Sequence, residues 1–343
     1  MKRASLKDIA EALNVSKTLV SLVLNNKADE WGISEETQKK VRKKAEELNY
    51  YPNQMARGLR TGKSNIIGLV VADISNPFYA KISRTIEFEV ARLGYHLLVC
   101  SSDEVEEKEI KLIELLRDRQ RVEGLIVATT QQNAEQFSQL KKQQYPLVFI
   151  DRKLPGFSAS YVGVDNNKGA YEMVEHLIKS GMKKIGMVNI SPMHLSTLNE
   201  RVDGYKDALK KNGIKFNNDW VQSVSYNDIA NTTAEAVSKL LSPSVGVQAI
   251  FTVNNYVAIN CLQAIHKMKK RIPQDVAIVC FDDLDAFNFS HPPLTTVAQP
   301  VEQIGEESVK MLMKQIDGKK FVVSEKILPT KLIIRESCGS VLA

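Results

Sequence analysis

The sequence predicts an α/β protein in which an N-terminal three-helix unit with a helix-turn-helix precedes two lobes of doubly wound parallel sheets. The first 50 residues contain only helix-type spacings of apolar residues, whereas from residue 64 onward short apolar runs alternate with amphipathic helices. Such alternation is typical of parallel sheets covered by helices on both faces. Ten strand candidates in about 270 residues suit two lobes better than one.

Three short helices are expected in residues 1–50, which we call the headpiece. The first has an apolar face along the segment LKDIAEAL. Ser16 caps the second, after a connection of only two residues, Asn14 and Val15. A polar loop follows, and Ser34 and Thr37 mark the start of the third helix. Two helices joined by so short a turn and followed by a third are typical of a helix-turn-helix.

The outer face of the second helix is polar except for one leucine. The apolar stripe that faces a core consists of Leu19, Val20, Val23 and Leu24. A helix with this polar face suits the major groove of DNA, where Leu22 would meet the apolar methyl group of a thymine. The alternative is a purely structural three-helix domain. The predicted DNA contacts of this helix are Lys17, Thr18, Ser21, Leu22 and Asn25.

Positive charge is concentrated at the N-terminal end. Residues 1–63 carry 13 Lys and Arg against 8 Asp and Glu, whereas the whole chain has a net charge of +6. An excess of cations at one end is expected where that end meets a polyanion such as DNA. Solvated charge on a small domain can produce the same bias.

Residues 51–63 form a linker between the headpiece and the lobes. Pro52 ends the third helix, and Asn53 can cap a very short helix over residues 54–60. This helix is too short to be stable alone, and it contains Gly58, which costs about 1 kcal/mol relative to alanine. We expect it to be ordered only when something else holds it.

The remaining chain alternates between strands and helices. Strands are expected at residues 66–72, 96–100, 124–128, 147–150, 162–164, 185–189, 221–226, 249–252, 276–281 and 295–297. Helices are expected at residues 78–93, 105–119, 133–143, 169–180, 198–212, 232–241, 256–268 and 304–316.

The sequence lacks motifs for catalysis, metal binding and membrane insertion. Its longest apolar runs are well short of the roughly 20 residues that span a bilayer, and the N-terminus has no apolar signal-peptide core. The four cysteines and five histidines are scattered. Residues 58–64 resemble a P-loop, but they have one residue too few before Gly-Lys-Ser and lead into a strand. We expect a cytoplasmic protein that is not an enzyme and uses no cofactor or metal.

Distinctive segments follow one another in a fixed order. They are LKDIAEALNVSKTLVSLVLN, ISEETQKKVRKKAEELNYYPNQMARGLRTGKSNIIGLVVADISNPFYA, RVEGLIVA, IDR at residues 150–152, ERVDGY, FDDLD, PPLTTVAQP and LIIRESC. Together they resemble the LacI family of bacterial transcriptional repressors over essentially the whole chain. The resemblance implies a homodimer whose two headpieces read a near-palindromic operator, and lobes similar to sugar-binding periplasmic proteins. It is much less specific for the ligand.

The resemblance also gives the linker a role. In family members its short helix folds on DNA, lies in the minor groove and drives a leucine between the central base pairs. The leucine at that place is Leu59, flanked by Arg57 and Arg60. An apolar wedge unstacks a base step, and arginines favour the negative potential of a narrow groove. The linker residues expected at DNA are Asn53, Met55, Ala56, Arg57, Leu59 and Arg60.

Two positions of the second helix depart from the family pattern. Leu19 stands where most members have threonine, and Leu22 stands where they have a polar arginine or histidine. A base-reading arginine bonds O6 and N7 of guanine, and leucine cannot. We therefore predict an operator that lacks this guanine contact and presents thymine methyl groups to Leu22.

The resemblance places a ligand between an N-lobe, about residues 64–162 and 293–322, and a C-lobe, about residues 163–292 and 323–340. Carboxylates, amides and an arginine around an aromatic face suit a polyhydroxy ligand, since each hydroxyl both donates and accepts hydrogen bonds. The residues at the matching positions are Asp73, Asn76, Phe78, Tyr79, Asp151, Arg152, Thr197, Arg201, Tyr226, Asn254, Asp282 and Gln299.

Some of these residues have alternative interpretations. Asp151 and Asp282 can simply cap helices, and Phe78 and Tyr79 can belong to a core. Asn255 stands where the family usually has aspartate, so we expect the local polar network to differ there.

These observations predict a transcriptional regulator, a repressor first of all, that responds to a sugar or sugar acid. Closure of the cleft would change the spacing of the two linker helices and so the affinity for the operator; induction and co-repression are both compatible with the sequence. A dimer is expected, because no leucine heptads follow Cys338. The alternatives are a catabolite-control regulator whose co-effector is a phosphorylated carrier protein, and a two-lobe sugar-binding protein that does not bind DNA.

Overall fold

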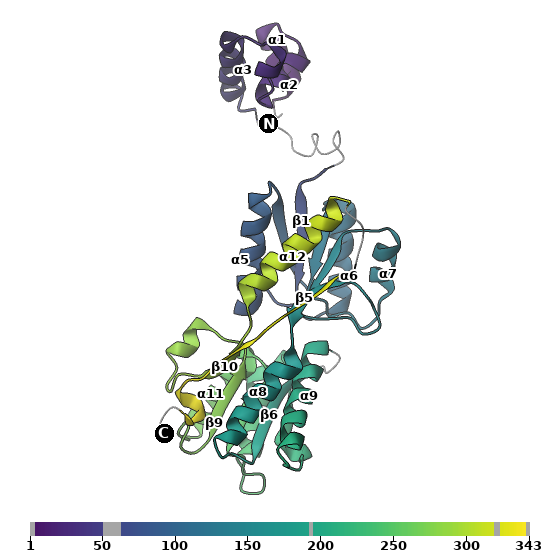
Figure 1. Ribbon diagram of the computed structural model, residues 1–343. Helices are drawn as coiled ribbons and strands as arrows, with labels where there is room; N and C mark the ends of the chain where they lie inside the picture. The colour runs from purple at the N-terminus through teal and green to yellow at the C-terminus, as the bar shows by residue number, and fades with distance from the viewer. Residues whose placement is uncertain (1–3, 51–62, 192–194, 319–322, 341–343) are drawn as a thin grey trace. The chain divides into compact units, whose positions relative to one another are not determined.

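Figure 1 shows the computed structural model of the chain. The structure describes residues 4–50, 63–191, 195–318 and 323–340. They belong to two compact units, Met1–Ser64 and Asn65–Ala343. The short helix predicted for residues 54–60 lies outside the described residues.

The first unit contains the three predicted helices. They are α1 (Leu6–Leu13), α2 (Lys17–Leu24) and α3 (Glu35–Glu47), with a one-turn 3₁₀ helix at Asp29–Trp31. Ser16 caps α2 by accepting a hydrogen bond from the backbone N–H of Leu19 at 3.1 Å. The two-residue connection is possible because Asn14 adopts a left-handed conformation, with φ of 50°. The predicted helix-turn-helix is confirmed.

The core of the first unit is small and draws on all three helices. Its buried side chains are Ile9, Ala10, Val20, Val23, Ala28, Val41 and Ala45. Leu19 and Leu24 are partly buried and pack against this core, as the predicted apolar stripe requires. Leu22 is only half-buried and is not among the described side chains that pack there. The side chain of Leu22 therefore lies outside the core of the headpiece.

The second unit contains two sheets of six strands each. The first sheet has the order β11-β5-β4-β3-β1-β2 and the second has the order β12-β10-β9-β8-β6-β7. All pairings are parallel except that of β12 with β10. The first sheet comprises β1 (Ile66–Val71), β2 (His96–Ser101), β3 (Gly124–Val127), β4 (Leu147–Ile150), β5 (Ser160–Val164) and β11 (Glu325–Leu328). The second comprises β6 (Ile185–Ser191), β7 (Val221–Ser225), β8 (Ala249–Thr252), β9 (Ala277–Phe281), β10 (Thr295–Ala298) and β12 (Lys331–Ile333).

Helices cover both sheets, and α5 and α12 lie side by side on the first (Figure 1). The helices are α5 (Pro77–Arg92), α6 (Glu106–Glu114), α7 (Glu135–Lys142), α8 (Asn166–Lys179), α9 (Ser196–Lys211), α10 (Ile229–Leu240), α11 (Asn255–Lys267) and α12 (Val301–Ile316). A π-helical turn, Leu115–Arg119, continues α6. Helix α8 begins three residues before its predicted start because Asp165 caps it through the N–H of Lys168. None of the described helices is long and apolar enough to span a membrane.

Two strands and part of the lobe assignment differ from the predictions. Strands β11 and β12 were not predicted, because they are short and β11 is largely exposed rather than an apolar run. Strand β10 pairs with β9 in the second sheet, although residues 293–322 were expected in the N-lobe. Strand β11 pairs with β5 in the first sheet, although residues 323–340 were expected in the C-lobe. Both strands lie beside crossings between the lobes, where position along the chain does not reveal the pairing partner.

The two sheets repeat one strand order without a recognisable sequence repeat, although β12 runs antiparallel and β11 parallel to its neighbour. If β1 to β5 and β11 are matched with β6 to β10 and β12, the strand orders are identical. In each sheet the strand in third place from the β11 or β12 edge is buried along its whole length, as β4 and β9 show. The residue after β4 is Asp151 and the residue after β9 is Asp282. The repeat therefore gives the two lobes matching aspartates.

Helices α8 and α9 approach each other closely at Gly204. A Cβ atom at this position would lie 2.1 Å from the backbone oxygen of Asn167 on α8. No side chain fits at that distance, so the contact requires glycine. The ERVDGY segment thus fixes the position of α9, which also carries Thr197 and Arg201.

We predict that Gly204→Ala lowers the free energy of unfolding by about 2–4 kcal/mol, because the backbones of α8 and α9 must separate to admit the methyl group. Urea unfolding followed by circular dichroism measures this change. Asp203→Ala, an exposed neighbour on the same helix, is the control and should cost less than about 0.5 kcal/mol. Equal effects of the two substitutions would contradict the role given to the close approach.

Candidate functional site

A cavity lies between the two sheets of the second unit, where strands of both sheets end. Its volume is about 60 Å³, several times the 10–15 Å³ or so that holds one water molecule. All twelve residues predicted to bind a ligand line it. Six further lining residues were not predicted: Glu104, Ile190, Ser191, Leu195, Leu198 and Tyr256. The carboxyl ends of parallel strands are where ligands bind in such sheets.

Asp151 and Asp282 occupy equivalent places at the cavity. The backbone N–H of Asp151 donates to the carbonyl of Val162 on β5, and that of Asp282 donates to the carbonyl of Val297 on β10, at 3.1 and 2.9 Å. Both aspartates have positive φ, 62° and 79°. A left-handed residue other than glycine costs about 1–3 kcal/mol and persists only where its surroundings demand it. Neither aspartate is a helix cap, so that alternative is wrong for both.

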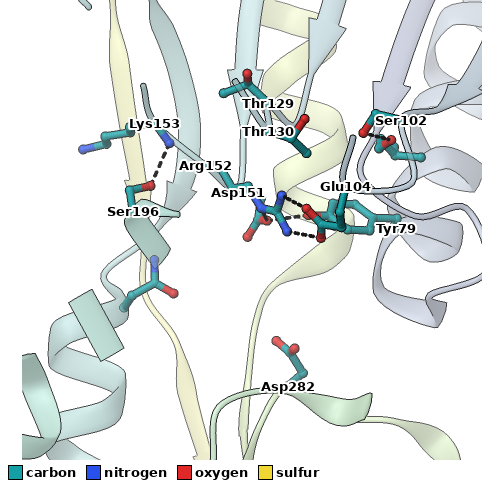
Figure 2. Close-up of polar contacts among 12 residues, drawn as sticks. Tyr79, Ser102, Glu104, Thr129, Thr130, Asp151, Arg152, Lys153, Ser196 and Asp282 are labelled. Atoms are coloured by element: carbon teal, nitrogen blue, oxygen red, sulfur yellow. Dashed lines mark hydrogen bonds and ion pairs between the residues drawn. The ribbon is translucent and has the colours of Figure 1, made fainter. Parts of the chain in front are cut away.

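Arg152 is held in a network of acidic and phenolic groups (Figure 2). Its Nη1 and Nη2 donate to the two carboxylate oxygens of Glu104, both at 2.6 Å. Its Nε lies 3.5 Å from Oδ2 of Asp151, which also accepts a hydrogen bond from the Tyr79 hydroxyl at 2.7 Å. Burial raises the pKa of Tyr79 well above its ordinary value, so the phenol stays protonated and donates. A bidentate pair of this kind fixes the guanidinium in one orientation.

Hydrogen bonds that Tyr226 and Tyr256 make with Asp73 and Ser75 connect the two lobes across the cavity. Asp73 follows β1, and its Oδ2 accepts from the hydroxyls of Tyr226 and Tyr256 at 3.2 and 3.1 Å. The hydroxyl of Ser75 lies 2.8 Å from that of Tyr256. Burial raises the pKa of both tyrosines, which keeps these hydroxyls protonated. The carboxylate of Asp73 therefore accepts O–H donors that come from the second lobe.

Two further hydrogen bonds cross between the lobes. Asn76 caps α5 through the N–H of Phe78, and its side-chain oxygen also accepts from the Asn255 amide at 2.9 Å. Asn255, which stands where the family usually has aspartate, thus donates an N–H to Asn76. The backbone N–H of Lys153 donates to the hydroxyl of Ser196, at the start of α9, at 3.0 Å (Figure 2).

Arg201 is buried on α9 and fixed on three sides. Its Nε donates to the side-chain oxygen of Asn166 at 2.9 Å, and its Nη1 donates to the carbonyl of Val253 at 2.8 Å. The guanidinium carbon lies 3.7 Å from the ring centre of Phe281, a cation–π contact. Among the described residues, none accepts a hydrogen bond from Nη2. This side chain therefore retains an N–H group for another partner at the cavity wall.

Asp282 lies against the Gln299 amide, whose Nε2 donates to its Oδ1 at 2.6 Å. Burial raises the pKa of Asp282, and the nearby positive charge of Arg201 opposes that shift. The amide of Gln299 thus holds this carboxyl group at the cavity wall, with the charge of Arg201 nearby.

The remaining predicted residues combine structural and lining roles. Asn254 caps α11 through the N–H of Val257 at 3.0 Å. Phe78 and Tyr79 are buried in the core, with an edge-to-face contact between their rings, and both also line the cavity. Thr197 is buried in the first turn of α9. The core interpretation of the two aromatic residues and their place at the cavity are therefore both correct.

Two of the unpredicted lining residues could have been found from the sequence. Glu104 follows β2 by three residues, so it lies at the same edge of the sheet as Asp73. Tyr256 is two residues beyond Asn254, itself a predicted residue. The apolar residues, such as Leu195 and Leu198, carry no signal that distinguishes them from core side chains.

The predicted DNA-binding residues of the headpiece lie on one helix. Lys17, Thr18 and Asn25 are exposed, and Ser21 and Leu22 are half-buried. The amide of Asn25 donates to the carbonyl and the hydroxyl of Ser21, at 2.7 and 3.3 Å, so its donors are used within the helix. The six linker residues predicted to contact DNA lie outside the described residues: Asn53, Met55, Ala56, Arg57, Leu59 and Arg60.

A helix-turn-helix unit joined to two lobes with a polar cavity between them defines the class of ligand-responsive transcriptional regulators. Residues 5–53 match the lacI family of bacterial regulatory proteins, and residues 174–338 match a periplasmic binding protein-like domain. The chain belongs to the lacI family.

Relatives of known designation match over nearly the full chain. The chain is 32% identical over 335 residues to the HTH-type transcriptional regulator KdgR of Bacillus subtilis, which covers 97% of each protein. It is 33% identical to the ribose operon repressor of Halalkalibacterium halodurans, over 97% of this chain and 96% of the relative. Among solved structures, the lac repressor bound to ONPG in its repressed state is similar, with a TM-score of 0.85, 25% identity, and coverage of 98% and 100%.

The raised pKa of Asp282 leads to a prediction about stability. A carboxyl group whose folded-state pKa lies above its unfolded value contributes stability at low pH, and this contribution is lost as the pH rises through the folded pKa. We predict that Asp282→Asn, which cannot ionise, raises the melting temperature relative to the unmodified chain at pH 8 more than at pH 4. Asp203→Asn, at an exposed position, should change the melting temperature by the same amount at pH 8 and at pH 4. A pH-independent effect of Asp282→Asn would contradict the argument.

Proposed function

We propose that this protein is a repressor that binds operator DNA as a homodimer and is controlled by a carbohydrate, a sugar or a sugar acid, bound between its lobes. The observation that carries the proposal is the gathering of all twelve predicted ligand residues around one cavity bridged by hydrogen bonds from both lobes. The ribose operon repressor among the relatives supports a sugar as the kind of effector.

In this proposal each part of the chain has its own role. Residues 1–50 read the major groove through Lys17, Thr18, Ser21, Leu22 and Asn25. Residues 51–63 form the linker, whose Leu59 enters the minor groove between Arg57 and Arg60. Residues 64–343 bind the effector and the second protomer. The protein acts in the cytoplasm and binds its effector without transforming it.

An exposed aromatic side chain supports a partner surface for the second protomer. Phe289 is 87% exposed, in the turn that follows Asp285–Asn288. The ion pair between Lys81 and Asp285, at 3.0 Å, places this turn beside α5 of the other lobe. Burial of this side chain in an interface would be favourable. The turn thus suits a dimer that contacts both lobes.

The regulatory mechanism follows from the bonds across the cavity. A bound ligand competes with Tyr226 and Tyr256 for the oxygens of Asp73 and so changes the equilibrium between two arrangements of the lobes. If the two arrangements set different spacings of the linkers, the ligand alters operator affinity. The change is at most the ratio of the ligand's affinities for the two arrangements.

We predict that DNA selected from random sequence by the full chain binds with an affinity that falls steeply with salt, because phosphate contacts release counterions. Lys17→Ala should lower the slope of log affinity against log salt by about one per protomer. Lys40→Ala, which removes an exposed lysine paired with Glu36 on α3, is the matched control and should leave the slope unchanged.

We also expect the selected half-site to place thymine at Leu22. Retention of a guanine there, together with an unaltered preference in Leu22→Arg, would refute the leucine contact.

The cavity assignment has a separate test. We predict that Arg201→Ala lowers effector affinity at least about tenfold, since a hydrogen bond to a charged group contributes about 1.5–3 kcal/mol. The variant should still bind the selected DNA but should no longer respond to the effector. Fluorescence anisotropy of labelled DNA, with and without effector, measures both properties. A full response in Arg201→Ala would show that the effector binds elsewhere.

A further inference from the structure

The charges around the cavity are unequal. Its described lining contains four carboxylates, those of Asp73, Glu104, Asp151 and Asp282, and two guanidiniums, those of Arg152 and Arg201. The formal balance is therefore negative. Because Asp151 and Asp282 are 7% and 6% exposed, solvent and salt screen them much less than surface charges.

Arg152 is already committed to acidic partners. It makes a bidentate pair with Glu104, and its Nε faces Asp151. The side chains of Arg152 and Glu104 are 9% and 15% exposed. To turn toward an anionic ligand, Arg152 would have to leave Glu104 as an unpaired and largely buried charge, which is strongly unfavourable. This arginine is therefore unsuited to binding a carboxylate or phosphate.

The cavity wall has unmet acceptors beside two donors, the Nη2 of Arg201 and the Nε of Arg152, which has no hydrogen-bond partner but lies 3.5 Å from Oδ2 of Asp151. The side-chain oxygen of Gln299 is buried and has no hydrogen-bond partner. Its identity as oxygen is fixed because the nitrogen of the same amide donates to Asp282. Asp151 accepts through Oδ2, and none of the described residues donates to its Oδ1. The buried oxygen of Gln299 requires a donor, and Oδ1 of Asp151 is available to accept one.

Asp73 shows which donors these carboxylates accept. Its Oδ2 receives two phenolic O–H groups, from Tyr226 and Tyr256, and its Oδ1 receives the hydroxyl and the N–H of Ser75. Uncharged O–H and N–H donors therefore satisfy a carboxylate in this cavity without a cation.

We propose that the cavity binds a polyhydroxy ligand that carries no negative charge, a neutral or amino-substituted sugar, and discriminates against sugar acids and sugar phosphates. Hydroxyl and amino groups donate to Asp151, Asp282 and Gln299 and can accept from the free Nη2 of Arg201. A carboxylate or phosphate supplies only acceptors and is repelled by the two aspartates. This inference rests on the proposed function, which makes the cavity the effector site, and narrows the class of effector.

The test uses matched sets of ligands with the full chain. One set is glucose, glucosamine, glucuronate and glucose 6-phosphate; others are built in the same way on galactose and ribose. Thermal shift identifies binders, and isothermal titration calorimetry measures their dissociation constants. In every set that binds, the acid and the phosphate should bind at least about tenfold more weakly than the neutral or amino sugar, as expected for a like charge in a poorly screened site.

Two variants separate charge repulsion from a general structural effect. Asp151→Asn and Asp282→Asn should each reduce the ratio of affinities between the neutral sugar and its acid by about tenfold, because each removes one repulsive charge. Loss of structure alone would weaken all members of a set equally. Asp203→Asn, on the exposed face of α9, should leave the ratio unchanged. If one variant fails to fold, the other provides the same comparison.

The outcomes distinguish this inference from the proposed function. An acid or phosphate that binds more tightly than its neutral counterpart, with binding lost in Arg201→Ala, overturns the inference and leaves the cavity as the effector site. Binding of any probe that survives Arg201→Ala unchanged overturns the cavity assignment itself. If none of the neutral and amino sugars binds, the inference is overturned too, since the inference requires one of them to bind. Tighter binding of a neutral or amino sugar, lost in Arg201→Ala, supports both.

Discussion

The parallel direction of the strands is the constraint on which the second unit depends. In each sheet the central strands run parallel, so the loops after them emerge at one edge, and these two edges line a single cavity. Residues far apart in the chain are brought together by this arrangement alone. Asp73 lies after the first strand and Tyr226 after the seventh, yet they share a hydrogen bond. The cavity is a consequence of topology before it is a consequence of any particular side chain.

The same constraint explains why the cavity wall contains charge and backbone strain. A buried carboxylate is unfavourable unless it accepts hydrogen bonds, and each one here accepts at least one. Glu104 has the fork of Arg152, and Asp282 has the amide of Gln299. Asp151 and Asp282 also hold left-handed backbone conformations that the adjacent strands stabilise through their carbonyl groups. The cavity wall therefore combines buried charge with strained backbone at Asp151 and Asp282.

The headpiece divides its small apolar content between two uses. Val20 and Val23 of α2 are buried in the core, whereas Leu22 is half-buried outside it. In a domain with so small a core, most apolar side chains are expected to be buried in it, so the position of Leu22 outside the core is informative. Its neighbours Lys17 and Thr18 are exposed beside it on the same helix. A mixed face of this composition fits the floor and walls of a major groove.

Local patterns in the sequence determined the elements. Helix spacing, capping residues and apolar runs predicted the three headpiece helices and ten strands, because these signals depend only on near neighbours along the chain. Motifs shared with the lacI family identified twelve of the eighteen residues that line the cavity. Tertiary structure alone decided which sheet each strand joined and which partner each polar group received. Strand β10 belongs to one lobe and β11 to the other because pairing depends on distant backbone, and the Arg152–Glu104 pair joins residues 48 positions apart. Short-range signals specify what each segment becomes, whereas charges and hydrogen bonds at the cavity are settled only when the fold brings their partners within reach.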